Sequence, residues 1–271
     1  KNCFSSLYGI FVSQTIFSFV RMVKVSAVSY LNTIPFIRGL KSSNLFSSIN
    51  LSLDYPSECA YKLLNGKVDL GLVPIAIIPE LRDSYIISDY CIGSDGPVDT
   101  VCVFSDVPIE EIESIALDYQ SRTSVLLLHI LLKEYWCLNP KLEKTDEGFE
   151  DKIKGNKAAL IIGDRAFKLH NTYKFIYDLS DIWKKFTGLP FVFACWVSNK
   201  KLKSSFIRDF NKALTVGLDD IDKTVYLLKE RYPENFNIHK YLKEKISYSL
   251  DAEKRKAMSL FFNKINSQHS F

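Results

Sequence analysis

Short apolar runs alternate with longer amphipathic stretches from residue 23 to residue 198, and only helical patterns follow. Continuous or alternating apolar residues predict strands, and apolar residues recurring every three to four positions predict helices. The expected strands are Val23–Val28, Ile49–Asp54, Asp69–Val73, Ile86–Ile92, Val98–Ser105, Ile115–Leu117, Ala158–Gly163, Phe175–Leu179 and Phe191–Ser198. The expected helices are Ile34–Leu40, Pro56–Asn65, Ser124–Tyr135, Ser180–Thr187, Lys203–Asp219, Asp220–Arg231, His239–Lys245 and Ala252–Ile265. This alternation predicts an α/β protein with parallel sheets.

Two of the expected strands, Val98–Ser105 and Phe191–Ser198, are placed to connect two lobes. The pattern predicts a first lobe made of residues 22–103 and 197–271, with the C-terminal helices packing back onto it. It predicts that residues 104–196 form the second lobe. Because ligands of such folds bind at the carboxyl ends of the strands, we expect a ligand cleft between the lobes that closes over its ligand.

Residues 1–21 stand apart from this pattern. The run from Leu7 to Val20 is mostly apolar, but it is too short to span a bilayer and Gln14 interrupts it. No small-residue cleavage site follows the run. Since Met22 directly precedes the first strand, we expect the folded protein to start there, and residues 1–21 to be an upstream extension, a cleaved leader or a disordered arm.

Composition and charge narrow the classes of function. The chain has 271 residues, 47% apolar and 24% charged, as in ordinary proteins with a packed core. The net charge is +4 and the basic residues are scattered, so a nucleic-acid groove is not indicated. None of the six cysteines forms a CxxC pair or a zinc-like cluster, and we expect neither metal nor cofactor. Cys102 and Cys195 lie in apolar runs, which predicts buried free thiols and a reducing, cytoplasmic compartment.

Two segments far apart in the chain each read as a strand that runs into a helix. They are Val25–Phe36 (VSAVSYLNTIPF) and Ile115–Leu132 (IALDYQSRTSVLLLHILL). The polar residues at the two junctions are Ser29, Tyr30, Asn32 and Thr33 in the first and Ser121, Arg122, Thr123 and Ser124 in the second. Free backbone N–H groups at a helix start favour anions. Two such junctions facing each other predict a clamp for a small molecule with two carboxylates.

Each junction residue also has a purely structural alternative. Asn32 is the first candidate for the reacting centre, because its amide can donate to a leaving hydroxyl or to a carboxylate, but asparagine is also a common helix cap. Ser121 and Thr123 either contact the ligand or cap the following helix. Arg122 either binds a carboxylate or forms a structural ion pair.

Further candidates for ligand contacts lie in the second half of the chain, on or directly after expected strands. Asp164 follows a buried strand, at the usual place of a strand-end site residue, or caps the turn after it. Phe191, Phe193 and Trp196 either wall an apolar pocket for a ring or simply build a core.

No side chain stands out as a general base. His129 lies within an apolar helix, so a core or interface histidine is expected there. No Ser/His/Asp or Cys/His set is visible. A carboxylate of the substrate itself is therefore a possible base.

Five segments resemble one known family, in the family's own order. They are Ser29–Pro35 (SYLNTIP), Asp69–Pro74 (DLGLVP), Ser121–Ser124 (SRTS), Gly163–Asp164 and Thr187–Trp196 (TGLPFVFACW). Together they resemble the MqnA/MqnD menaquinone-biosynthesis family, closest to its chorismate dehydratase branch, from about Met22 to the C-terminus. The resemblance implies a two-lobe fold of the periplasmic-binding-protein type II kind, used as a cytoplasmic enzyme without a cofactor.

The resemblance also implies a reaction and its residues. Chorismate would lose water to give 3-[(1-carboxyvinyl)oxy]benzoate, a carbon-oxygen lyase step of the futalosine route. The sister branch opens on a Ser-Pro-Cys-Pro-Asn-Asp type motif, and the run from Ser29 to Thr33 here favours the dehydratase instead. Asn32 is expected to be catalytic. The residues expected to bind substrate are Ser29, Tyr30, Thr33, Pro74, Thr100, Ser121, Arg122, Thr123, Ser124, Asp164, Phe191 and Phe193.

Two positions depart from the family pattern. Ile75 and Ala76 follow DLGLVP where the family has a small polar residue, and Asp99 precedes Thr100 at the family's hydroxyl position. A carboxylate at Asp99 is unfavourable beside a dianion unless it points away from it.

Two other functions remain open at this point. The chain could be a non-catalytic solute-binding protein for a small carboxylate, or the sister 1,4-dihydroxy-6-naphthoate synthase. One fold serves binders and enzymes alike, so the fold does not decide between them. The expected partner is a small dicarboxylate, chorismate, with no nucleic acid and no stable membrane span, and the protein is expected to be a monomer or a homodimer.

Overall fold

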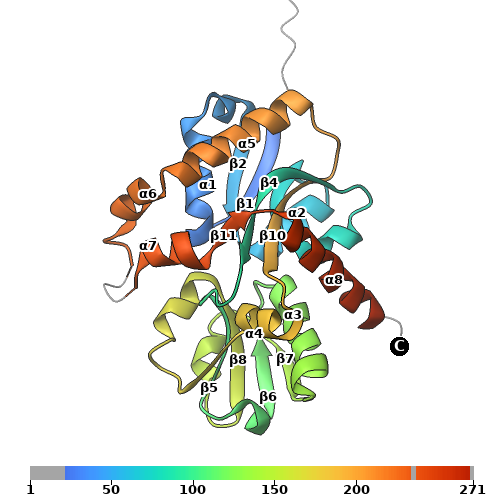
Figure 1. The fold of residues 1–271 in the computed structure, drawn as a ribbon, viewed down its shortest axis with the longest axis vertical. Helices are drawn as coiled ribbons and strands as arrows, with labels where there is room; N and C mark the ends of the chain where they lie inside the picture. Colours follow the sequence, from blue (N-terminus) through green and yellow to red (C-terminus); the bar gives the residue numbers. More distant parts are fainter. Residues whose placement is uncertain (1–21, 233–235, 269–271) are drawn as a thin grey trace, which may run out of the picture.

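The structure is a computed structural model and describes residues 22–232 and 236–268. Two sheets form two lobes, one above the other in Figure 1. The sheet of the first lobe has the strand order β11-β4-β10-β3-β1-β2. Its strands are β1 (Val23–Val28), β2 (Ile49–Asp54), β3 (Leu70–Pro74), β4 (Tyr85–Ser94), β10 (Phe191–Ser198) and β11 (Ser247–Ser249).

The sheet of the second lobe has the strand order β7-β6-β8-β5-β9. Its strands are β5 (Val101–Ser105), β6 (Ser114–Leu117), β7 (Lys141–Lys144), β8 (Lys157–Ile162) and β9 (Phe175–Asp178). The strands β7 and β11 fall where no strand is expected from the sequence pattern. Both are short, polar edge strands, which carry little of the apolar signal by which a strand is recognised.

Both sheets are mixed, so the expectation of parallel sheets is only half right. β1 runs parallel to β2 and β3, and β6 runs parallel to β7 and β8. β10 is antiparallel to both of its neighbours, β3 and β4. β5 is likewise antiparallel to β8 and β9. These are the strands by which the chain enters each lobe from the other one, so they run against the βα units around them.

The two strands expected to cross between the lobes do not cross. Val101–Ser105 pairs only within the second sheet and Phe191–Ser198 only within the first. The chain passes between the lobes in two connections, residues 95–100 and residues 188–190. Strand pairing therefore moves the lobe boundaries from 103/104 and 196/197 to these two connections.

Helices pack on both sheets, and one of them, at the C-terminus, also contacts the other lobe. In the first lobe they are α1 (Ile34–Ser42), α2 (Pro56–Leu64), α5 (Ser204–Asp219), α6 (Ile221–Leu228), α7 (Ile238–Lys240) and α8 (Ala252–Gln268), and in the second α3 (Thr123–Leu131) and α4 (Leu179–Thr187). A Cβ at Gly39 would lie 2.0 Å from the carbonyl oxygen of Ala213, so a glycine is needed where α1 crosses α5. The C-terminal helix α8 packs on β10 and contacts α3 of the other lobe (Figure 1).

The cysteines fit the expected buried thiols. Cys102 and Cys195 are fully buried and carry no disulfide, and the same holds for Cys59 and Cys91, whereas Cys137 is exposed. Within the part of the chain that the structure describes, no helix is long and apolar enough to cross a membrane. The expectation for residues 1–21 lies outside the described residues.

Candidate ligand site between the lobes

A cavity of about 550 Å³, counting its open mouth, lies between the two lobes. Both predicted junction segments contribute to it. The predicted residues that line it are Tyr30, Asn32, Pro74, Thr100, Ser121, Thr123, Ser124 and Phe193. The lining residues that were not expected to contact a ligand are Val28, Pro56, Ile92, Val98, Val101, Ile162, Gly163 and Ala194.

The cavity wall is uncharged. None of the described residues that line it is Asp, Glu, His, Lys or Arg. Its polar groups are hydroxyls, one carboxamide and backbone groups, set among apolar side chains from both sheets. Such a wall can hold an anion only through N–H and O–H donors, as at helix starts.

Asn32 lies in a short 3-10 helix (Leu31–Thr33) that leads from β1 into α1, and it is 8% exposed. Its side chain caps neither helix, so the capping alternative is wrong. Instead, Nδ2 donates to the hydroxyl of Tyr241 at 3.3 Å and Oδ1 accepts from the hydroxyl of Thr33 at 3.2 Å. The carboxamide is thus fixed at the cavity wall with one N–H still free to donate.

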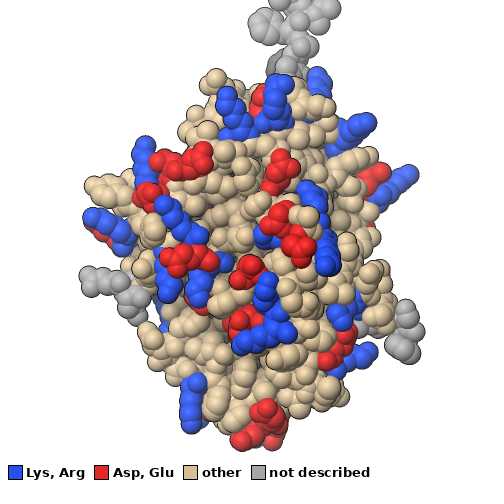
Figure 2. Space-filling view, viewed as in Figure 1, with Lys and Arg blue, Asp and Glu red and all other residues tan. Residues whose placement is uncertain are grey.

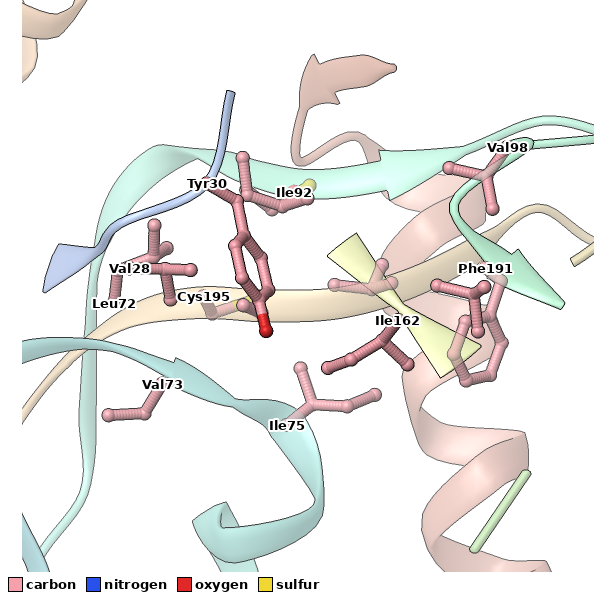
Figure 3. Packing of buried hydrophobic residues seen from close by; sticks show 14 of the residues in the cluster. Val28, Tyr30, Leu72, Val73, Ile75, Ile92, Val98, Ile162, Phe191 and Cys195 are labelled. Atoms are coloured by element: carbon pink, nitrogen blue, oxygen red, sulfur yellow. The ribbon is translucent and has the colours of Figure 1, made fainter. Parts of the chain in front are cut away.

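Tyr30 closes one side of the cavity by reaching across to the second lobe. Its hydroxyl donates to Oε1 of Gln120, and its ring lies on Gly163. A Cβ at Gly163 would lie 2.6 Å from that ring, and the φ of +68° there also favours glycine. Figure 3 shows the ring of Tyr30 between apolar side chains of both lobes, among them Ile92 and Ile162. Burial raises the pKa of the Tyr30 hydroxyl, which therefore stays protonated.

The start of α3 supplies the donors of the second lobe. The Ser121 oxygen accepts the backbone N–H of Ser124 at 3.1 Å, so Ser121 satisfies one N–H of the helix start, as its capping alternative proposed. Among the described residues its own O–H has no acceptor and can donate to a ligand. The hydroxyl of Ser124 has no hydrogen-bond partner among the described residues. Thr123 is different: its hydroxyl donates to the carbonyl of Phe193 and accepts the N–H of Ala76, each at 3.2 Å. Thr123 therefore ties the two lobes together.

Arg122 and Asp164 do not line the cavity. Arg122 forms a largely exposed ion pair with Glu80 of the first lobe at 3.3 Å, as its structural alternative proposed. The Asp164 carboxylate accepts the backbone N–H of Leu31 at 3.1 Å and the hydroxyl of Tyr232 at 3.1 Å. It does not cap its own turn, so that alternative is wrong. Burial raises the pKa of Asp164, which joins the lobes beside the cavity.

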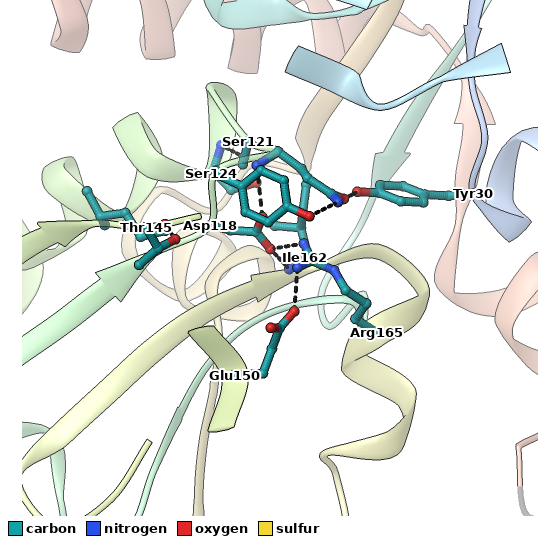
Figure 4. Close-up of polar contacts among 11 residues, drawn as sticks. Tyr30, Asp118, Ser121, Ser124, Thr145, Glu150, Ile162 and Arg165 are labelled. Atoms are coloured by element: carbon teal, nitrogen blue, oxygen red, sulfur yellow. Dashed lines mark hydrogen bonds and ion pairs between the residues drawn. The ribbon is translucent and has the colours of Figure 1, made fainter. Parts of the chain in front are cut away.

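A cluster of three charged residues, Asp118, Arg165 and Glu150, lies next to Gln120 and holds its backbone in place. This cluster could not be recognised in the sequence. Asp118 is 1% exposed; its Oδ2 accepts from Arg165 at 2.5 Å and from the N–H of Ile162 at 2.8 Å, and its Oδ1 accepts the N–H of Gln120 at 2.9 Å. Arg165 also binds Glu150 at 2.5 Å (Figure 4). Burial raises the pKa of Asp118 and the Arg165 cation opposes that rise. The only sequence signal was the position of Asp118 at the end of a strand.

The connection at residues 95–100 is held by two aspartates. Asp99 has a φ of +64°, and its carboxylate pairs with Lys245 at 3.1 Å. It does not line the cavity, so the concern over a carboxylate beside a dianion does not apply. The buried carboxylate of Asp178 caps α4 and also accepts the N–H groups of Val98 and Asp99 at 2.8 and 2.6 Å. Burial raises its pKa to about 6.

The remaining candidates lie away from the cavity. Phe191 and Trp196 are buried in the core, where Phe191 packs on Trp183 and Phe261. Three other residues considered in the sequence do not line the cavity either. Ser29 is exposed, Thr33 is buried and hydrogen-bonded to Asn32, and His129 is half-buried in a separate surface hollow.

Two global features bear on ligand chemistry. On the face seen in Figure 2, acidic and basic side chains are interspersed, in line with the scattered charge expected from the sequence. Within residues 22–232 and 236–268, no group of three or more His, Cys, Asp or Glu is placed to hold a metal ion.

Sequence relatives point to one family. A chorismate dehydratase of Thermus thermophilus is 32% identical over 164 residues, which cover 54% of this chain and 60% of that protein, less than two thirds of its length. A chorismate dehydratase of Campylobacter jejuni is 26% identical over 247 residues, covering 86% of this chain and 93% of that protein.

Solved structures agree on the fold. A protein of Archaeoglobus fulgidus superposes with a TM-score of 0.72 at 12% identity, covering 92% of this chain and 98% of that one. A Candida albicans protein with the generic periplasmic binding protein fold superposes with a TM-score of 0.57 at 12% identity. The match covers 91% of this chain and 95% of that one. The fold is therefore the expected two-lobe fold of the periplasmic-binding-protein kind. The sequence profile described as menaquinone biosynthesis matches residues 23–267, and the chain belongs to that family.

Proposed function

We propose that this protein is a chorismate dehydratase. The observation that carries the proposal is the uncharged cavity between the lobes, where Asn32 of one junction faces the Ser121–Ser124 junction of the other lobe. The family and its chorismate dehydratase relatives supply the reaction. Chorismate loses one ring proton and its ring hydroxyl, and the ring becomes aromatic as water leaves. Four buried free thiols suit a reducing cytoplasm as the site of this reaction.

An uncharged wall suits a reaction in which the ligand's charge does not change. Chorismate and the product both carry two carboxylates. A cation on a carboxylate that takes the ring proton would oppose that transfer, and a cation on a carboxylate that stays ionised would stabilise substrate, transition state and product alike. Such uniform binding does not raise kcat. The free O–H of Ser121, the O–H of Ser124 and the start of α3 can hold a carboxylate without a fixed cation.

The charge that does change develops on the leaving hydroxyl. In this proposal the free N–H of Asn32 donates to that oxygen as its bond to carbon breaks, which is the kind of interaction made only in the transition state. The described lining residues include no carboxylate, imidazole or amine to take the ring proton. A carboxylate of the substrate is therefore the proposed base, and the wall holds it against the ring. The carboxylate takes the ring proton, the C–H electron pair enters the ring as the C–O bond breaks, and the proton then passes to the departing hydroxide, which leaves as water.

The decisive experiment is incubation of the purified protein with chorismate, followed by mass spectrometry for a product lighter by one water. Formation of that product faster than in buffer supports the proposal. Chorismate at 100 times its Kd should also stabilise the fold by about 2.7 kcal/mol. Unchanged chorismate in the presence of protein that it stabilises against heat would instead support a solute-binding protein, a function that the same fold also serves.

A further inference from the structure

One phenol from the C-terminal part of the chain reaches the polar edge of the cavity. Tyr241 follows α7 and is 2% exposed. Its hydroxyl accepts from Nδ2 of Asn32 at 3.3 Å and lies 3.0 Å from the hydroxyl oxygen of Thr100. Asn32 belongs to the first lobe and Thr100 ends the connection to the second lobe. Tyr241 therefore contacts a wall residue on each side of the lobe boundary.

The order of donors in this chain of contacts follows from counting protons. The Tyr241 oxygen already accepts from Asn32, so its single proton goes to Thr100, its other partner. Thr100 then accepts from Tyr241, and its own proton is left to donate. The nearest protein acceptor for that proton is the carbonyl of Val98 at 3.5 Å, at the limit of a hydrogen bond. The proton of Thr100 is therefore available to a ligand in the cavity.

We propose that Tyr241 is a positioning residue that sets the direction of two donors, the carboxamide of Asn32 and the hydroxyl of Thr100, toward the cavity. The proposal rests on the proposed function for the chemistry that these donors serve. Tyr241 itself does not line the cavity, so it acts through its two partners.

The surroundings of Tyr241 keep its hydroxyl in place. Its ring packs edge-on against Phe167 with centroids 5.2 Å apart, and against Phe236 at 5.6 Å. Burial holds the pKa of the phenol well above its usual range, so it remains a donor at any ordinary pH. A second buried tyrosine, Tyr248, donates to the backbone carbonyl of Asn32 at 2.9 Å and fixes the backbone of the same residue.

The test replaces only the hydroxyl. Tyr241→Phe keeps the ring and its packing but leaves Asn32 without an acceptor and Thr100 without a donor. The matched control is Tyr90→Phe, because Tyr90 is also paired with a threonine hydroxyl, Thr215 at 2.9 Å, outside the cavity. Both variants lose one tyrosine–threonine hydrogen bond, so a general loss of stability affects both.

The expected kinetic result is a fall in kcat of about 10- to 100-fold for Tyr241→Phe, less than the 10²–10³-fold effect of removing a direct donor. KM should change less than threefold, because the carboxylate contacts remain. In an Asn32→Ala background, Tyr241→Phe should cost much less, since the two act as a unit. Tyr90→Phe should keep the wild-type kcat. If wild-type protein turns over chorismate and Tyr241→Phe has the same kcat, the positioning role of Tyr241 is overturned and the proposed function stands.

A second readout does not depend on turnover. In protein labelled with ¹⁵N-asparagine, the side-chain N–H pair of Asn32 is identified by its loss in Asn32→Ala. Tyr241→Phe should shift that pair and speed its hydrogen exchange at least tenfold, and Tyr90→Phe should leave it unchanged. If wild-type protein does not convert chorismate, the proposed function fails while this measurement still decides the positioning role: an unshifted Asn32 amide in Tyr241→Phe overturns it.

Discussion

The ring of Tyr30 lies directly against the α-carbon of Gly163, although the two residues belong to different lobes. The lobes are thus closed onto each other at a point where any side chain at position 163 would push them apart: a Cβ there would lie 2.6 Å from the Tyr30 ring. Closure around a ligand excludes water and strengthens the polar contacts inside the site. This contact therefore gives the most direct way to separate closure from folding.

Gly163→Ala should weaken ligand binding more than it weakens the fold. The left-handed φ of +68° costs an alanine about 1–2 kcal/mol, and the Tyr30 ring must also move. Gly66→Ala is the control, since its φ is +64° and nothing lies within 4 Å of a Cβ there. Both variants should lose about 1–2 kcal/mol of unfolding free energy in urea from the backbone, and Gly163→Ala should lose more because the Tyr30 ring must move. Only Gly163→Ala should raise the Kd for chorismate by calorimetry, and an equal Kd for both would show that the contact is not needed for closure.

Asn32→Ala should abolish most turnover in a folded protein. The carboxamide makes two side-chain hydrogen bonds and leaves one N–H to the cavity, so its loss should lower kcat about 10²–10³-fold. Stability should fall by only about 1–2 kcal/mol. Asn211→Ala is the control. The side-chain oxygen of Asn211 accepts hydrogen bonds from the Ser88 hydroxyl and the Asp89 N–H, at a place that does not line the cavity. A normal rate in folded Asn32→Ala would remove Asn32 from the site.

Thr123→Val should favour an open form. The change keeps the shape but leaves the N–H of Ala76 without its acceptor and the carbonyl of Phe193 without its donor, at a cost of about 1–3 kcal/mol to the closed form. If the closed form binds ligand, Kd rises about 5- to 150-fold. Small-angle scattering should show a larger radius of gyration without ligand.

Thr224→Val is the control for that experiment. Thr224 is fully buried, but its hydroxyl donates only to the carbonyl of Asp220 at the start of its own helix. It should leave Kd and the radius of gyration unchanged. An unchanged radius of gyration in Thr123→Val as well would mean that other contacts hold the lobes closed.

Asp178 should make the fold less stable as pH rises from about 4 to about 6. Burial raises the pKa of its carboxyl to about 6 in the folded protein, above the ordinary value of 3.8, so the folded state binds the extra proton in this window. Stability from this group is present below pH 3.8 and is lost as pH rises through about 6.

The measurement compares wild type with Asp178→Asn. The urea-derived stability of wild type minus that of Asp178→Asn should shrink by ~2 kcal/mol between pH 4 and pH 6 and stay level above pH 7. Because the other acidic groups titrate alike in both proteins, their contribution to the pH dependence of stability cancels in this difference. A difference that grows with pH would mean that the four N–H donors of Asp178 outweigh its burial.

The junctions of the site were predictable because they are local. A strand that ends in small polar residues before a helix is visible in sequence, so both junctions could be named, and Tyr30, Asn32, Ser121, Thr123 and Ser124 line the cavity. The direction of a strand is not visible, because an apolar run reads the same for parallel and antiparallel pairing. The antiparallel course of β10, and with it the lobe boundary, therefore could not be predicted.

Two further features of the site could not be predicted from the sequence: the direction of some side chains and the pairing of residues far apart in the chain. Phe191 and Phe193 were expected on one face, but the pairing of β10 with β4 shifts register between Val192 and Ala194, and only Phe193 lines the cavity. Such a bulge re-aims a side chain without a sequence signature. The pairing of Asp118 with Arg165 joins residues 47 positions apart, and only the folded chain brings them together.

The place of β10 in its sheet also dictates an order of events while the chain is being made. β10 lies between β3 and β4 in the first sheet, yet it is made after the whole second lobe. When synthesis has reached residue 187, every strand of the second sheet is present, whereas the first sheet still lacks β10 from its middle and β11 from its edge. Domains fold as units once their parts are available. We therefore expect the lobe that comes second in the sequence to fold first, and the emerging β10 to complete the lobe whose synthesis began earlier.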